Sequence, residues 1–135
     1  MKYHSFFDSF LPIAPYFKPI YGTEISIKVY AFGPRIPQLN MDLIYARALS
    51  DAVAIHHRST ISMGPGVLYK WNMAISEGEL ELHLALGNRM TWQMWAWVCN
   101  ALMQFMKDFE YVELAFDVVF NPFGTIAQGS VKVSV

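Results

Sequence analysis

The sequence predicts an α+β domain in which two helices cover one face of an antiparallel sheet. Five segments alternate apolar and polar residues, as half-buried strands do, and two others repeat apolar residues every three or four positions, as amphipathic helices do. These segments follow the order β-α-β-β-α-β-β along 135 residues, a length typical of one domain. We therefore expect a single two-layer sandwich.

The composition supports a folded domain and argues against several classes of protein. Hydrophobic residues make up 54% of the chain and charged residues only 16%, whereas an average soluble domain has about 25% charged residues. This apolar content excludes intrinsic disorder, and the net charge of −1 is unlike that of a highly basic nucleic-acid-binding protein. The single cysteine, Cys99, excludes a disulfide framework within one chain and is consistent with a reducing compartment, so we expect a cytoplasmic protein.

The beginning of the chain differs in composition from the rest. Seven of the first 22 residues are aromatic, and Pro12, Pro15 and Pro19 exclude a long helix. We therefore predict an aromatic arm over residues 1–22, followed by one domain over residues 23–135. We predict neither a signal peptide nor a membrane span, because charged and polar residues interrupt the long apolar runs.

The predicted domain begins with a strand over residues 23–32, where every second residue from Ile25 to Ala31 is apolar. A helix follows over residues 40–58, with Asn40 as its N-terminal cap and apolar residues at spacings of three and four. Glycine and proline residues lie between the two segments, which indicates that a turn separates strand and helix.

The middle of the domain contains a predicted hairpin. Its two strands cover residues 67–75 and 79–86 and are joined by a short turn. A second helix is predicted over residues 91–109, with Thr91 as its N-terminal cap.

Two final strands, over residues 112–120 and 126–135, complete the series. The first six elements have the order of the ferredoxin-like, or split βαβ, fold. A weak internal repeat agrees with two βαβ halves, because Gly33 and Gly87 each follow a strand and precede a helix. In this arrangement the last strand pairs with strand 112–120 as a hairpin and extends one edge of the sheet.

The second face of the predicted sheet is polar and could carry acid–base chemistry. His83 and Asp117 lie on it, and an imidazole with a carboxylate is a common pair for proton transfer. His56, near the end of the first predicted helix, is a further candidate. A solvated sheet face with cross-strand charge pairs explains the same residues, so these roles apply only if the chain is an enzyme. The acidic residues on this face, and the fact that only Tyr30 and Phe32 are candidate stacking rings, argue against RNA binding.

No sequence motif indicates a metal or a cofactor. The chain contains no H-x-x-x-H or C-x-x-C spacing, no P-loop and no G-x-G-x-x-G segment. We therefore expect neither a metal ion nor a cofactor.

The second predicted helix is more apolar than a helix on an open sheet needs to be. Apolar residues cover roughly 200° of its circumference. One sheet buries only part of this arc, so the aromatic arm, a second subunit or a hydrophobic ligand must cover the remainder. The residues predicted to form this interface are Phe6, Phe7, Phe10, Met94, Trp97, Phe105 and Phe109.

Two functions of different classes follow from these observations. The first is a non-catalytic binding or assembly protein that buries the apolar flank of the second helix in a homo-oligomer or against a protein partner. The alternative is a cofactor-free cyclase, isomerase or lyase that acts on a lipophilic small molecule in a hydrophobic pocket. In that alternative the pocket is lined by Tyr69, Trp71, Trp92 and Trp95.

Part of the chain resembles small uncharacterised fungal proteins. In both, an Arg-x-x-Trp-x-x-Trp helix runs into an acidic, aromatic strand that ends in Phe-Asp-Val, and a glycine-containing last strand follows. The resemblance covers about a third of the chain and implies no particular activity. The matching residues are Arg89, Thr91, Trp92, Trp95, Phe105, Phe116, Asp117, Val118 and Gly129.

Overall fold

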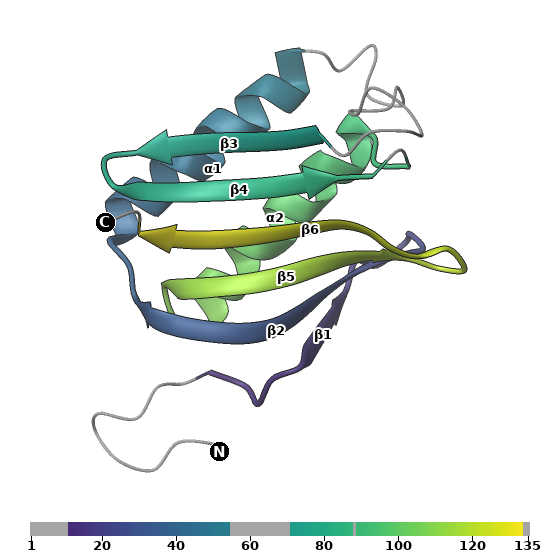
Figure 1. Cartoon of the computed structure of the whole chain (residues 1–135), viewed down its shortest axis with the longest axis horizontal. Helices are drawn as coiled ribbons and strands as arrows, with labels where there is room; N and C mark the ends of the chain where they lie inside the picture. The colour runs from purple at the N-terminus through teal and green to yellow at the C-terminus, as the bar shows by residue number, and fades with distance from the viewer. Residues whose placement is uncertain (1–10, 55–70, 88, 134–135) are drawn as a thin grey trace.

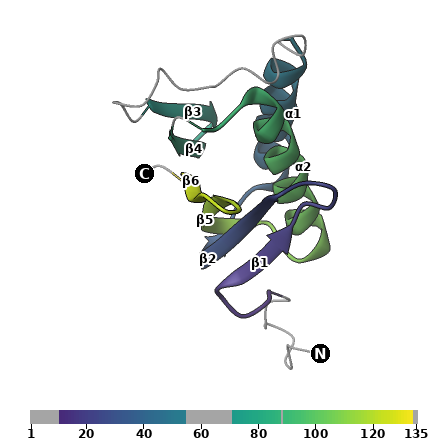
Figure 2. The ribbon, with the colours of Figure 1, turned by 90° about the vertical axis from the view of Figure 1, so that its right-hand side faces the viewer.

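Two helices lie on one side of a six-stranded sheet in the computed structural model of the chain, which describes residues 11–54, 71–87 and 89–133 (Figures 1 and 2). This arrangement confirms the predicted α+β class. In chain order the elements are β1 (Tyr16–Pro19), β2 (Ile25–Arg35), α1 (Gln38–Ala54), β3 (Trp71–Glu77), β4 (Leu80–Leu86), α2 (Trp92–Asp108), β5 (Val112–Phe120) and β6 (Gly124–Val133).

The strands lie in the order β1-β2-β5-β6-β4-β3, and all neighbouring pairs are antiparallel. The predicted hairpin of the last two strands is confirmed, but the expected edge position of β6 is wrong, because β6 lies between β5 and β4. Ala127 and Val131 of β6 are buried on the side of the helices, and a central strand buries such residues better than an edge strand does. The ferredoxin-like strand order is therefore not confirmed.

Part of the predicted aromatic arm belongs to the sheet. The short strand β1 pairs with β2, with Tyr16 opposite Val29, and forms an edge of the sheet (Figure 1). Pro15 precedes β1 and Pro19 is its last residue. Proline cannot donate a ladder hydrogen bond, so within sheets it is found at edge strands such as this one. The arm thus adds an edge strand next to β2, which the sequence pattern does not predict.

A β-bulge in β2 changes which residues face the helices. Val29 lies opposite Phe116, but Ala31 lies opposite Ala115, so the register shifts by one residue between them. The sequence pattern places Ala31 on the same face as Val29. The structure corrects this, because the extra residue turns Ala31 to the helix-free face and Phe32 toward the helices.

The two helices begin differently from one another. α2 begins as predicted, since the Thr91 hydroxyl accepts a hydrogen bond from the Met94 amide at 3.1 Å. The predicted cap of α1 is wrong: this helix begins at Gln38, and the Asn40 side chain instead donates to the Glu77 carbonyl at 3.0 Å. Among the described residues, no helix is long and apolar enough to cross a membrane.

The core lies between the helices and the sheet. Its largest fully buried side chains include Tyr45 of α1, Trp95 and Phe105 of α2, and Phe116 of β5. Cys99 is buried among them, and burial raises the pKa of its thiol well above the ordinary value. The thiol is therefore protonated at neutral pH and acts as a small apolar group.

Candidate functional site

The predicted acid–base pair is not brought together by the sheet. His83 of β4 lies opposite Ser130 of β6, whereas Asp117 of β5 lies opposite Gln128, two residues away on β6. Two strand spacings of about 4.8 Å and a shift of about 6.8 Å place the Cα atoms of His83 and Asp117 roughly 12 Å apart. Their side chains share the helix-free face of the sheet but are too distant for a hydrogen bond between them.

The described surroundings of these two residues consist of small side chains around His83 and an unpartnered oxygen on Asp117. His83 lies in a row of small side chains across the sheet, with Ala74 on one side and Ser130 followed by Ala115 on the other. Asp117 has one buried carboxylate oxygen, Oδ1, without a hydrogen-bond partner in the described part of the chain. The described residues include no group of three or more His, Cys, Asp or Glu side chains that could hold a metal ion.

The residues predicted to line a lipophilic pocket are dispersed in the described part of the structure. Trp95 is completely buried in the core, and its indole nitrogen has no hydrogen-bond partner there. Trp92 is half-buried and packs against the core. Trp71 begins β3, but its side chain lies outside what the structure describes, as do Tyr69 and the candidate proton carrier His56.

The apolar flank of α2 is covered largely by the chain itself. The ring of Phe105 is only 1% exposed, because Phe32 stacks on it at a centroid distance of 5.9 Å and Tyr16 lies 5.6 Å away. Tyr16 also packs edge-on against Phe109 at 5.6 Å. The arm strand β1 and the bulged end of β2 therefore bury the C-terminal part of this flank.

The other predicted interface residues keep some exposed surface or lie outside the described residues. Met94, Trp97 and Phe109 are partly buried and pack against the core. The described structure does not include Phe6, Phe7 and Phe10. An interface on α2 would thus use the remaining exposed surface of Met94, Trp97 and Phe109, since Phe105 has almost none left.

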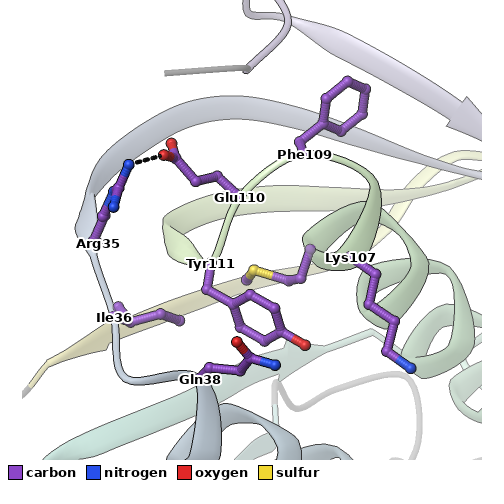
Figure 3. A pocket seen from close by; sticks show the side chains of 8 residues that line it. Arg35, Ile36, Gln38, Lys107, Phe109, Glu110 and Tyr111 are labelled. Atoms are coloured by element: carbon purple, nitrogen blue, oxygen red, sulfur yellow. Dashed lines mark hydrogen bonds and ion pairs between the residues drawn. The ribbon is translucent and has the colours of Figure 1, made fainter. Parts of the chain in front are cut away.

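A pocket of about 580 Å³ lies between the end of α2 and the beginning of α1 (Figure 3). Two loops form its walls: the loop between β2 and α1, and the loop between α2 and β5. They are adjacent because Arg35, at the end of β2, pairs with Val112, at the start of β5. The amide of Ile36 also donates to the carbonyl of Tyr111 at 3.0 Å. We call this hollow the helix-end pocket; its lining residues are Arg35, Ile36, Gln38, Met106, Lys107, Phe109, Glu110 and Tyr111.

The Tyr111 side chain lies at the centre of the helix-end pocket (Figure 3). Its hydroxyl donates a hydrogen bond to Asp42 Oδ1 at 2.8 Å, which ties the link after α2 to α1. Burial, the hydrogen bond to Asp42 and the charge of Asp42 raise the pKa of Tyr111 to about 12. The phenol is therefore neutral at physiological pH and serves as a hydrogen-bond donor.

Two cationic side chains lie on opposite sides of Tyr111 (Figure 3). Arg35 Nη2 lies 2.6 Å from Glu110 Oε2, and the Arg35 side chain is 76% exposed while that of Glu110 is 13% exposed. Lys107 projects from the last turn of α2. The ionisable groups of the lining are Arg35, Lys107, Glu110 and Tyr111.

Sequence patterns miss this pocket because half of its lining residues lie in loops and the other half lie at the ends of helices or strands. The signal that could have pointed to it is the Gly33-Pro34-Arg35 break between the first strand and the first helix. Only the pairing of β2 with β5 brings that break beside Glu110 and Tyr111.

Comparisons with protein families, with characterised proteins and with solved structures find no significant match to the chain. The resemblance to small fungal proteins thus stays a prediction.

Proposed function

We propose that the chain is a non-catalytic binding protein whose ligand site is the helix-end pocket. The observation that carries this proposal is a hollow in which polar groups are held in place around an apolar floor. Tyr111 is fixed by Asp42, and Arg35 is fixed by Glu110. Ligand sites commonly combine a concave surface, apolar contacts and a few oriented polar groups.

The chemistry of the pocket favours binding over catalysis. A cyclase, isomerase or lyase needs a group that moves a proton near its substrate. The phenol of Tyr111 holds its proton at neutral pH, and the candidates His83 and Asp117 lie far from each other on the helix-free face of the sheet. The enzyme alternative therefore has no described cluster of residues that supports it.

Association with a second copy of the chain is a second candidate. It is supported by the remaining exposed surface of Met94, Trp97 and Phe109 on α2. Two exposed leucines one turn apart on α1, Leu39 at 70% and Leu43 at 44%, add apolar surface on the helical layer. This candidate does not exclude a ligand in the helix-end pocket.

A fluorescent apolar probe tests the binding function directly. N-phenylnaphthylamine, an uncharged molecule that fluoresces more strongly in apolar surroundings, is titrated into the protein. We expect saturable binding that Gln38→Trp weakens by at least about tenfold, because the indole fills the pocket. Gln93→Trp is the matched control, since Gln93 is also an exposed glutamine in the first turn of a helix but does not line the pocket. Equal affinity in the two variants would contradict the proposal.

A further inference from the structure

We infer that the helix-end pocket selects an amphipathic organic anion, whose acidic group binds the Arg35 guanidinium and whose apolar body lies against the ring of Tyr111. This inference rests on the proposed binding function and specifies its ligand class. It draws on the charges, exposure and contacts of the residues that line the pocket.

The Arg35 guanidinium is held in place but retains donors for a ligand. A guanidinium has five N–H donors in one plane, and Glu110 engages Nη2. The Glu110 carboxylate is nearly covered, whereas the Arg35 side chain is 76% exposed. The ion pair therefore holds one end of the guanidinium at the rim and leaves its other N–H groups accessible. Such a fork binds carboxylate, sulfonate or phosphate oxygens in pairs.

The other charges of the lining also favour an anion. Lys107 is exposed, and no ion pair joins it to another residue of the described structure. Because Glu110 neutralises only one of the two cations, the lining carries one excess positive charge. Tyr111 adds no charge while its phenol is protonated, and the Asp42 carboxylate that accepts its hydrogen bond keeps its negative charge but does not line the pocket.

The apolar part of the pocket accounts for the amphipathic character of the proposed ligand. Ile36 and Met106 close the floor and are 6% and 1% exposed. The ring of Tyr111 is partly exposed beside them, whereas the ring of Phe109 points away from Tyr111 (Figure 3). A ligand that carries only a charge would leave the Tyr111 ring in water, whereas one with an aromatic or aliphatic body would cover it.

Glu110 competes with the ligand for the guanidinium, which gives the inference a distinctive consequence. Removing the charge of Glu110 frees Arg35 and should strengthen the binding of an anion. Removing the charge of Arg35 should weaken it. A nonspecific surface effect predicts no such dependence on this particular pair, because another exposed pair, Arg47 with Glu77 at 3.1 Å, offers the same charges elsewhere.

The test compares anilinonaphthalene sulfonate with N-phenylnaphthylamine, which has the same rings but no sulfonate. We expect Arg35→Met to weaken sulfonate binding at least about tenfold and to leave the uncharged probe within about twofold. Glu110→Gln should strengthen sulfonate binding by about threefold or more. The matched controls Arg47→Met and Glu77→Gln should change the affinity for neither probe, and circular dichroism checks that all four variants are folded.

The outcomes separate this inference from the proposed function. If the uncharged probe binds in a way that depends on Gln38 but Arg35→Met leaves sulfonate binding unchanged, the anion selectivity is overturned and the binding function stands. An equal loss in Arg47→Met and Arg35→Met also overturns the selectivity. If neither probe binds the unaltered protein, the binding function itself fails.

Discussion

The ring of Phe116 on β5 covers the Cα of Gly129 on the neighbouring strand β6, so closely that a side chain on Gly129 would overlap the ring. Phe116 is fully buried beneath the helices. The glycine thus allows a large aromatic residue to lie flat at the centre of the sheet. This pair helps to explain how β6 occupies a central position although one of its core-facing residues has no side chain.

Gly129→Ala is therefore expected to destabilise the protein. The added methyl group overpacks a buried site, which typically costs about 1–3 kcal/mol. Urea denaturation monitored by circular dichroism measures the free energy of unfolding. Ser130→Ala, the next position on β6 but on the helix-free face, is the control and should change stability little. In the Gly129→Ala background, Phe116→Leu should recover part of the loss; full stability of Gly129→Ala alone would show that the ring moves freely.

Local patterns in the sequence predict individual elements well. Strand β5 has the predicted bounds, and α2 begins at the predicted cap Thr91. Both elements are amphipathic over their whole length, so the period of apolar residues is enough to define them. The bulge in β2 breaks such a period, and nothing in the residues from Val29 to Phe32 marks it, because it depends on how β2 pairs with β5.

Long-range pairing also explains why the site was not predictable from sequence. The strand order depends on which strands pair with one another across the sheet, and local alternation does not reveal that β6 lies between β5 and β4. The helix-end pocket exists only because the end of β2 at Arg35 and the loop that contains Tyr111 become neighbours through the β2–β5 pair. Conversely, His83 and Asp117 share a face as the alternation predicts, but their separation across β6 could not be read from the sequence.

The cap of α2 gives a second stability prediction. The Thr91 hydroxyl accepts a hydrogen bond from the amide of Met94, which would otherwise lack a partner within the helix. Thr91→Ala should therefore cost about 1 kcal/mol of unfolding free energy. Chemical denaturation measures the loss. Thr91→Ser, which keeps the hydroxyl, should be close to the unaltered protein; an equal loss in both variants would assign the effect to the methyl group instead.

The contact between the arm and α2 can be tested at Tyr16. Its ring packs against Phe105 and Phe109, so Tyr16→Ala should destabilise the protein by roughly 2–3 kcal/mol through lost aromatic burial. Phe17→Ala is a matched control on the neighbouring residue, which is 55% exposed. Thermal unfolding compares the two. Similar melting temperatures for both variants would mean that β1 adds little to the stability of the domain.

Association through α2 has a clear signature in solution. If this second candidate function holds, light scattering should give the mass of two chains, and Trp97→Lys should give the mass of one, because a charge on a buried interface disfavours association. Gln93→Lys, at an exposed position of the same helix, should leave the mass unchanged. A single-chain mass for the unaltered protein would rule out the homo-oligomer.

The hydrogen bond between Tyr111 and Asp42 predicts a stability loss at high pH. The pKa of Tyr111 is raised from an ordinary value of 10.0 to about 12 in the folded protein. A group whose pKa is higher in the folded state contributes stability that is fully present below its unfolded pKa and disappears as the pH rises through the folded pKa. The contribution of Tyr111 should therefore fall between pH 10 and about 12.

Tyr111→Phe isolates this contribution. The variant loses the hydrogen bond, so it should be less stable than the unaltered protein by about 1 kcal/mol at neutral pH. The difference between the two proteins should shrink as the pH passes from 10 to about 12, because the unaltered protein then loses the phenolic proton. Burial raises the pKa of Tyr45 well above the ordinary value in both proteins, and the charge of ionised Tyr111 raises it further in the unaltered protein, which adds to the stability loss there. Urea denaturation at a series of pH values measures the difference; a constant gap across this range would show that Tyr111 does not donate to Asp42.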